Sequence, residues 1–361
     1  MKICFLGPAN SIHIIKWAKW FSSRGHEIHI ITFSPGKIDG AVVHLIDIGV
    51  DTNGSDLGKI KYLFTGNKIR ALLDKIQPDV INAHYATSYG AAMALSGIKG
   101  YALSVWGSDI YDFPKKSPMH KALLKFSLKN AGCLFSTSKA MADEAAKYTD
   151  RIFEITPFGV DLDLFNPDKR RKKTSDSSFT IGTVKGLSDK YGIRYILEAA
   201  AAIKRENDIP ISIRIAGKGP QEREYHQLAE NLGIKDNTTW LGFVSQEQAA
   251  EEWANMDIAI IPSTLESESF GVSAVEAQAC GTPVIISDIP GLMEATKPGE
   301  TSIVVKRNST KELVSAILRL YGDAEERRRL GKNGLEYVRR NYELNHCFEH
   351  IEELLLKNAI E

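Results

Sequence analysis

The sequence predicts an α/β protein built from two Rossmann-like, doubly wound domains, and three observations support this fold class. Short β-branched and apolar runs alternate with amphipathic segments along almost the whole chain, as they do in βαβ units. A polar, basic stretch at residues 166–178 interrupts the alternation once, and the same pattern resumes after it. The 361 residues are enough for two domains, each with its own hydrophobic core.

The first half of the chain contains seven runs that we expect to be strands. Most of them are continuously apolar, which is typical of parallel strands covered by helices on both faces. The segment from Ser11 to Gly25 is expected to be the first helix, with Gly25 closing its last turn. The expected strands are KICFL, IHIIT, VVHLI, DVINA, ALSVW, CLFST and IFEIT.

The second half repeats this pattern in six further runs: FTIGTV, ISIRIAG, TTWLG, DIAIIP, PVIIS and SIVVK. We therefore expect a first domain at residues 1–165, an exposed linker at 166–178 and a second domain at 179–340. Residues 341–361 are expected to form a helix that crosses back to the first domain.

The composition is typical of a soluble globular protein, with 43% hydrophobic and 25% charged residues. No apolar run approaches the ~20 residues that cross a bilayer, and the first residues lack the features of a signal peptide. The four cysteines lie far apart, which favours neither disulfides nor a zinc site and suggests a reducing cytoplasm. A net charge of zero argues against a nucleic-acid partner.

One loop-and-helix segment, STLESESFGVSAVEAQACG, carries two carboxylates in an apolar, alanine-rich setting. It follows the expected strand DIAIIP, and ligands of open α/β sheets bind beyond the carboxyl ends of strands. Glu268 could accept hydroxyl groups of a sugar ring, and Glu276, about two helical turns further on, could accept a ribose diol. A capping acid and a solvated helix glutamate are the alternative that the pattern leaves open.

The start of the same helix is a candidate anion site. Ser269 is expected to cap the helix, and Gly271 to let a ligand approach the backbone closely. The amides near Phe270, Gly271 and Val272 would then face an anion that the helix dipole favours.

This segment resembles the Glu-x7-Glu block of glycosyltransferase family 4, the retaining GT-B enzymes, which continues into an alanine-rich turn, Gly-x-Pro-Val and a strand. Further similar segments occur in the family's order: RGHEIHIIT, PDVINAHY, TPFGVDLDLF, IRIAGKGP and TTWLGFVS. The resemblance implies a GT-B fold, with two domains facing across a cleft. It also implies a retaining hexosyltransferase that moves a sugar from a UDP- or GDP-sugar to a glycan, glycolipid or small-molecule acceptor.

The resemblance assigns roles to matching positions of this chain. Glu268 should hold the donor sugar, Glu276 the ribose of the nucleotide, and the amides of Phe270 to Val272 the diphosphate. Other donor-binding candidates lie in loops after strands: Gly7, Gly217, Phe243, Val244 and Ser269.

Two lysines are candidates for neutralising the diphosphate as it departs, because negative charge grows there when the sugar–phosphate bond breaks. The family usually places an Arg and a Lys after the first strand of its second domain. Here TVKGLSDKYGI offers Lys185 and Lys190, each one position away from the commoner spacing. A solvated lysine at a helix start is the alternative for Lys190.

The N-terminal domain departs further from the family pattern. The loop GPANSIH replaces the common Gly-Gly loop, and its Asn10 and His13 lie at a helix start where phosphates or acceptors bind. Trp106 stands where the family commonly has a histidine that contacts the donor, so that role cannot be transferred. Asp109 is a candidate for sugar or acceptor binding, or else stabilises its loop, and His84 could partly replace the missing histidine.

The same residues bear on three rival functions. A nicotinamide dehydrogenase would need a GxGxxG loop after the first strand, which is missing. A GT-B nucleotide-sugar epimerase would be expected to lack the Glu-x7-Glu block, whereas Trp106 keeps a non-catalytic nucleotide-sugar-binding protein open. We expect no cofactor and no metal, because DLD at Asp161 to Asp163 belongs to the family's GVDLDLF segment.

Peripheral contact with the inner face of a membrane is a further hypothesis. KKSPMHKALLKFSLK places Lys121, Lys125 and Lys129 on one helical stripe beside apolar residues, a pattern that could dock on anionic lipid. Leucines that face the sheet and lysines that face solvent explain the same pattern.

Overall fold

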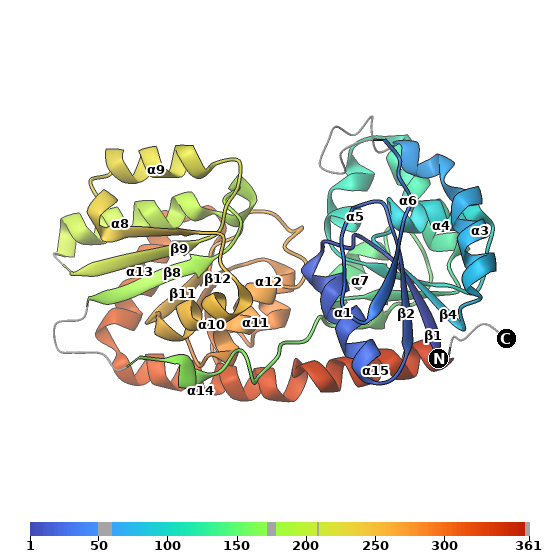
Figure 1. Ribbon diagram of the computed structural model, residues 1–361. Coiled ribbons are helices and arrows are strands. Elements are labelled where there is room, and N and C mark those ends of the chain that lie inside the picture. The colour runs from blue at the N-terminus through green and yellow to red at the C-terminus, as the bar shows by residue number, and fades with distance from the viewer. Residues whose placement is uncertain (50–59, 172–177, 208, 358–361) are drawn as a thin grey trace. The chain divides into compact units, whose positions relative to one another are not determined.

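The computed structural model describes residues 1–49, 60–171, 178–207 and 209–357, and it divides the chain into two compact units (Figure 1). The first comprises Met1–Phe158 and the C-terminal segment from His346, and the second comprises Gly159–Asn345. Each unit has one parallel sheet with helices on both faces, so the predicted α/β architecture of two Rossmann-like units is confirmed.

The sheet of the first unit has seven strands in the order β3-β2-β1-β4-β5-β6-β7. All of its strand pairs are parallel, and β4 is buried along its whole length, which explains its continuous apolar run. The strands are β1 (Lys2–Leu6), β2 (Glu27–Thr32), β3 (Ala41–Leu45), β4 (Val80–His84), β5 (Ala102–Val105), β6 (Cys133–Ser136) and β7 (Glu154–Ile155).

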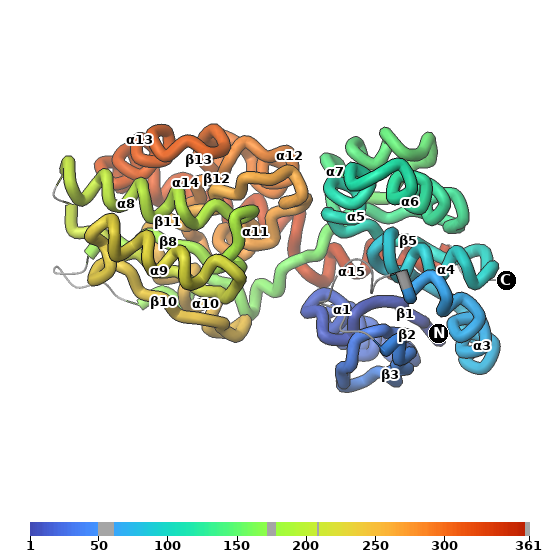
Figure 2. Tube along the Cα trace, turned by 90° about the horizontal axis from the view of Figure 1, so that it is seen from above, coloured from blue at the N-terminus to red at the C-terminus, as the bar shows by residue number. Residues whose placement is uncertain are grey.

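Helices cover both faces of this sheet. On one face α4 lies against α3 and α6, and on the other α1 packs against α15 (Figure 2). The aromatic rings of Trp17, Trp20 and Phe21 on α1 surround Phe348 on α15, which ties the C-terminal helix to the first unit. The helices are α1 (Ile12–Ser23), α3 (Gly66–Ile76), α4 (Tyr89–Ser96), α5 (Ser108–Tyr111), α6 (Pro118–Asn130), α7 (Lys139–Ala145) and α15 (Leu344–Lys357), with 3-10 turns η1 (Ile60–Phe64) and η2 (Phe113–Lys115).

The second unit has a six-stranded parallel sheet in the order β10-β9-β8-β11-β12-β13. Its β11 and β12 are completely buried, again in agreement with their apolar runs. The strands are β8 (Phe179–Val184), β9 (Ile211–Ala216), β10 (Thr238–Gly242), β11 (Ile258–Ile261), β12 (Val284–Ser287) and β13 (Ser302–Val305).

In this unit α8 contacts α9 and α13, whereas α11 contacts α10, α12 and α14. The 3-10 turn η4 (Asp189–Tyr191) precedes α8, and η3 (Pro167–Lys169) and η5 (Lys235–Asn237) lie in connections. The helices are α8 (Ile193–Asn207), α9 (Glu222–Asn231), α10 (Gln246–Asn255), α11 (Val272–Ala279), α12 (Pro290–Ala295), α13 (Thr310–Gly322) and α14 (Ala324–Asn341).

The passage between the units differs from the predicted linker at residues 166–178. The second unit begins at Gly159, and the part of the predicted linker that the structure describes is bound to it. The guanidinium of Arg170 donates to the carbonyls of Ala254 (2.7 Å) and Met256 (3.1 Å), at the end of α10. Carbonyls at the end of a helix lack N–H donors within it, which explains why an arginine binds there. Residues 172–177 lie outside the described part of the chain.

Both sheets reverse their strand order at one point, between β1 and β4 in the first unit and between β8 and β11 in the second. Ligands of doubly wound sheets bind beyond the carboxyl ends of the strands at such a point. The loops that follow these four strands are therefore the places where the predicted site residues should gather.

Candidate active site

In the second unit, the loops after β8 and β11 bring a lysine and a glutamate into direct contact. The Lys185 ammonium donates to Glu268 Oε1 at 2.9 Å, and their side chains are only 12% and 7% exposed. Both residues were predicted from the sequence as parts of one site, and the structure places them side by side. The carboxylate is thus neutralised within the protein by one of the two candidate cations.

Burial alone would lower the pKa of the Lys185 ammonium, but the charges around it outweigh this effect. Glu268 raises the pKa most, followed by Tyr191, and Glu276 contributes in the same direction, so the net pKa lies above its ordinary value. Lys185 therefore carries a full positive charge at neutral pH.

Lys190 reaches the same place from η4. Its ammonium donates to the carbonyl of Ser267 at 2.8 Å, the residue directly before Glu268. The ring of Tyr191 lies under both cations, with its centroid 4.6 Å from the Lys185 ammonium and 5.6 Å from that of Lys190. The alternative of a merely solvated Lys190 does not fit this geometry, because the lysine is bonded beside the candidate sugar-binding carboxylate.

Two backbone contacts hold the Lys185 loop in place. The hydroxyl of Ser273, in the first turn of α11, donates to the carbonyl of Val184 at 3.1 Å. On the other side Gly217 has a φ of +139°, and a Cβ at this position would lie 1.9 Å from the carbonyl oxygen of Lys185. Glycine is required there because no side chain fits between the loops after β8 and β9.

The start of α11 differs in one detail from the prediction. Gly271, not Ser269, is the N-cap residue, in a left-handed conformation with a φ of 77°. A Cβ on Gly271 would lie 2.6 Å from Leu292 on α12, so this glycine also permits close packing. Ser269 is buried in the preceding loop. Of the three amides predicted to form the anion site, that of Val272 lies in the first helical turn, where an α-helix offers no acceptor, and the amide of Ser273 lies there too.

Glu276 lies in the second turn of α11 and is 9% exposed. Its Oε2 accepts a hydrogen bond of 3.3 Å from the indole of Trp253 on α10. With Glu268 only 6% exposed, neither carboxylate is a solvated surface group, so the alternative of a capping acid with a solvated helix glutamate does not hold.

The loop after β10 carries the remaining donor candidates of this unit. The amide of Gly217 donates to the carbonyl of Gly242 at 2.7 Å, so the loops after β9 and β10 are joined. Phe243 is 80% exposed, and Val244 beside it is half-buried. An exposed phenylalanine at the carboxyl end of a strand is available to contact a ligand, but no contact ties it to Lys185 or Glu268.

In the first unit, three candidates from α1, the end of β4 and the loop after β5 form one aromatic cluster. The rings of His13 and Trp106 are 5.6 Å apart, and those of His84 and Trp106 are 5.2 Å apart. Phe158 stacks on His13 at 3.9 Å. Gly7 lies behind this cluster, where a Cβ would meet Ile14 at 2.6 Å, and Asn10 is exposed.

His84 is the buried member of this cluster. It is fully buried at the end of β4, and neither ring nitrogen has a hydrogen-bond partner. Burial, and secondarily His13, lowers the pKa of His84 from 6.5 to about 3, so the imidazole is neutral. In this arrangement His84 supports the ring of Trp106 from inside.

Asp109 differs from its predicted role in ligand binding. It is fully buried, and its carboxylate accepts hydrogen bonds from the amides of Ala86 (2.9 Å), Trp106 (3.1 Å) and Gly107 (2.8 Å). Burial raises its pKa, although these amides oppose the shift. The carboxylate joins the loops after β4 and β5, which is the loop-stabilising alternative of the sequence analysis.

Sequence reasoning missed three residues of these sites. Tyr191 and Trp253 orient the two lysines and Glu276, but nothing in their local sequence distinguishes them from ordinary core aromatics. Tyr85, directly after β4, has a φ of 74°, a conformation that non-glycine residues rarely adopt and that concentrates at functional sites. Its position beside His84 was the only available signal.

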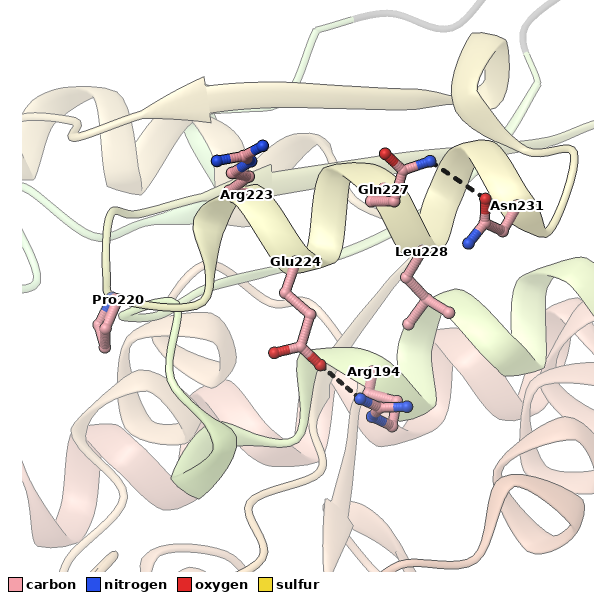
Figure 3. A pocket seen from close by; sticks show the side chains of 7 residues that line it. All are labelled: Arg194, Pro220, Arg223, Glu224, Gln227, Leu228 and Asn231. Carbon is pink, nitrogen blue, oxygen red and sulfur yellow. Dashed lines mark hydrogen bonds and ion pairs between the residues drawn. The ribbon is translucent and has the colours of Figure 1, made fainter.

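A separate depression lies between α8 and α9 on the second unit (Figure 3). Two polar pairs lie in it, with Arg194 paired to Glu224 at 2.5 Å and Gln227 bonded to Asn231 at 3.1 Å. None of the predicted site residues lines it. Its lining residues are Arg194, Pro220, Arg223, Glu224, Gln227, Leu228 and Asn231.

Among the residues that the structure describes, no group of three or more His, Cys, Asp or Glu side chains is arranged to hold a metal ion. Asp161, in the DLD segment, instead accepts from the amides of Asp163 (2.9 Å) and Leu164 (3.2 Å).

Known proteins are similar to this chain in sequence and in fold. The family model described as Glycosyl transferases group 1 matches residues 165–337, and that described as Glycosyl transferase 4-like matches residues 2–138. The chain is 30% identical to a D-inositol 3-phosphate glycosyltransferase of Paenarthrobacter aurescens, over 70% of this chain and 67% of that protein. It is 24% identical to N-acetyl-alpha-D-glucosaminyl L-malate synthase of Bacillus anthracis, over 89% and 86% of the two chains.

Solved structures share the fold along the whole chain. Sucrose-phosphate synthase from Thermosynechococcus elongatus superimposes with a TM-score of 0.85 at 20% identity, covering 99% of this chain and 98% of its own. Anabaena HepE in complex with UDP-glucose superimposes with a TM-score of 0.80 at 20% identity, covering 99% and 100%.

Proposed function

This chain belongs to glycosyltransferase family 4 and has the GT-B fold, and from that premise we propose that it transfers a sugar from a nucleotide diphosphate sugar to an acceptor hydroxyl with retention of configuration. The observation that carries the proposal is the convergence of Lys185, Lys190, Glu268 and the first turn of α11 beyond β8 and β11. Two cations, helix amides and a carboxylate together match a diphosphate joined to a sugar.

Each group has a role that follows from its chemistry. Lys185, Lys190 and the first-turn amides of α11 would bind the diphosphate and stabilise the charge that grows on it. Glu268 would accept hydrogen bonds from sugar hydroxyls, and Glu276 from the ribose. Phe243 and Val244 would lie near the base.

The transfer would proceed on one face of the sugar. The bond between the anomeric carbon and the phosphate oxygen breaks, and its electron pair stays on the diphosphate. The acceptor oxygen approaches from the same face and bonds to the anomeric carbon, while its proton passes to the leaving phosphate oxygen. No protein nucleophile and no metal ion is needed if the lysines and the helix amides neutralise the diphosphate.

The first unit would bind the acceptor. The α1 N-terminus offers amides beside His13, a setting that suits an anionic group on the acceptor. The two curated relatives are named for acceptors that carry a phosphate or carboxylates. Glycan, lipid-linked and small-molecule acceptors all remain within this proposal.

A thermal-shift and hydrolysis screen with UDP-, GDP-, ADP- and dTDP-sugars tests the donor site. We expect one nucleotide sugar to raise the Tm, and Glu276→Ala to weaken that effect by at least tenfold in apparent affinity. Glu251→Ala is the matched control, because Glu251 is 48% exposed and pairs with Arg171 at 3.0 Å elsewhere in the same unit. If no nucleotide sugar stabilises the wild type, the proposal fails.

Assays of turnover distinguish a glycosyltransferase from a nucleotide-sugar-binding protein and from an epimerase. Slow release of free sugar without an acceptor would support a glycosyltransferase, and the NMR coupling constant of the new anomeric proton reports retention. Binding with no release and no transfer would favour a non-catalytic nucleotide-sugar-binding protein. Conversion of the donor to another nucleotide sugar would identify an epimerase.

Peripheral membrane contact is a second proposal, and α6 carries it. Leu124 and Leu128 face the core, as in the alternative explanation, but Met119 is 71% and Phe126 37% exposed beside the exposed Lys125. Residues 113–130 contain no acidic residue. No helix in the described part of the chain is long and apolar enough to cross a membrane.

An apolar edge next to a lysine stripe is the arrangement of helices that lie on anionic bilayers. Sedimentation with vesicles containing 30% phosphatidylglycerol tests it, with Lys121→Glu, Lys125→Glu and Lys129→Glu combined. The wild type should sediment at low salt and the triple variant should not. Equal sedimentation of both proteins, or of neither, contradicts the proposal.

A further inference from the structure

Lys185 is bonded to one negative partner, and its loop is bonded to the helix turn proposed to bind a second. Its ammonium is bonded to Glu268 within the protein itself, in a setting where both side chains are nearly buried. The residue before it, Val184, is bonded by Ser273 in the first turn of α11, the turn assigned above to the diphosphate. One ammonium is therefore held by a fixed carboxylate, and it belongs to a loop that is bonded to the proposed place of a second anion.

The two lysines are not equivalent in this respect. Lys190 donates to a neutral acceptor, the carbonyl of Ser267. Lys185 is bonded to a charged acceptor, and burial makes it costly to leave Glu268 without a donor. The face of Tyr191 lies next to both ammonium groups, with its centroid 4.6 Å from that of Lys185 and 5.6 Å from that of Lys190.

We propose that Lys185 is shared between Glu268 and the donor diphosphate, and that this sharing makes the site prefer the nucleotide sugar over the nucleotide diphosphate product. The inference rests on the proposed function. Hydroxyls of a bound sugar donate to Glu268 and replace Lys185 there, so the lysine can serve the diphosphate fully. A free nucleotide diphosphate brings no such donor, so Lys185 must serve two anions, and Glu268 repels the phosphate.

The consequence is a site that weakens its hold on the product after transfer. Once the sugar has left, Glu268 again requires a donor, and Lys185 is the group bonded to it. Glu268 is thus a residue that discriminates substrate from product as well as a sugar ligand.

Isothermal titration of UDP and UDP-glucose, or of the corresponding pair for the base that the screen selects, tests this inference. Glu268→Gln keeps the shape and removes the negative charge. We expect this variant to bind the diphosphate about tenfold more tightly and the nucleotide sugar no more tightly than the wild type does. Glu251→Gln, which removes an exposed ion-paired carboxylate of the same unit, should change neither affinity.

A diphosphate affinity that is unchanged or weaker in Glu268→Gln overturns the inference. If this variant does not fold, the same inference is tested with the wild type. Free glucose at millimolar concentration should tighten binding of the diphosphate, because its hydroxyls donate to Glu268 and release Lys185. No tightening overturns the inference. A wild type that binds neither the diphosphate nor the nucleotide sugar overturns the proposed function itself, so the two failures are distinguishable.

Discussion

Acidification from pH 7 to pH 5 should destabilise the first unit, because His84 cannot take up a proton in the folded protein. Its ring is fully buried against Trp17 and Trp106, at centroid distances of 4.7 and 5.2 Å, and neither nitrogen has a hydrogen-bond partner. Burial first, and then His13, lowers its pKa from 6.5 to about 3.

The size of this effect follows from proton linkage. Below pH 6.5 the unfolded chain binds a proton at His84 that the folded chain does not bind until about pH 3. The stability is therefore fully present above pH 6.5 and is lost as the pH falls from 6.5 towards 3. With these pKa values the free energy of unfolding falls by about 2 kcal/mol between pH 7 and pH 5.

Urea unfolding followed by tryptophan fluorescence at pH 7 and pH 5 measures this loss. His84→Leu removes the titrating group. Between the two pH values, the free energy of unfolding of this variant should therefore fall by about 2 kcal/mol less than that of the wild type. His120→Gln, at a half-buried histidine bonded to Ser117 in the same unit, is the control and should behave as the wild type does. An equal loss in the wild type and His84→Leu would refute the reasoning.

Three further predictions follow from the contacts of single residues. Lys185→Met should lower the stability of the second unit by about 3 kcal/mol, since it leaves the buried Glu268 carboxylate unpaired, and adding Glu268→Gln should restore most of this loss in thermal melts. Asp109→Asn should cost about 2 kcal/mol, measured by urea unfolding, because an amide cannot accept from all three backbone N–H groups. The Asp109→Asn variant should bind the nucleotide sugar with the affinity of the wild type. A large loss of affinity would indicate that Asp109 takes part in ligand binding. Gly217→Ala should lower both the Tm and the nucleotide affinity, because its Cβ would lie 1.9 Å from the Lys185 carbonyl; an unchanged Tm would contradict this packing.

Much of the fold could be predicted from the sequence for a simple physical reason. A parallel strand with helices on both faces must be apolar along its length, and each of the thirteen expected runs overlaps a strand of the structure. The boundary between the units was less predictable. A run of arginines and lysines indicates an exposed linker, yet Arg170 binds carbonyls at the end of α10, a helix more than seventy residues away in the chain.

For the candidate site, too, the sequence could predict one part of the arrangement and not the other. Its position beyond β8 and β11 could be expected, because polar loops after apolar strands mark the carboxyl edge of a sheet. The role of Asp109 could not, because an aspartate after a strand looks the same whether it faces a ligand or three backbone amides.

The sequence by itself determined the order of the strands and helices and the family. It also determined which residues lie at the two points where the sheets reverse their strand order. These depend on local hydrophobic patterns and on motifs that are contiguous in the chain. Only the tertiary structure decided which of those residues touch. Lys185 and Glu268 are 83 positions apart, and their ion pair exists because β8 and β11 are neighbours in the sheet, with Tyr191 and Gly217 holding the lysine loop against it.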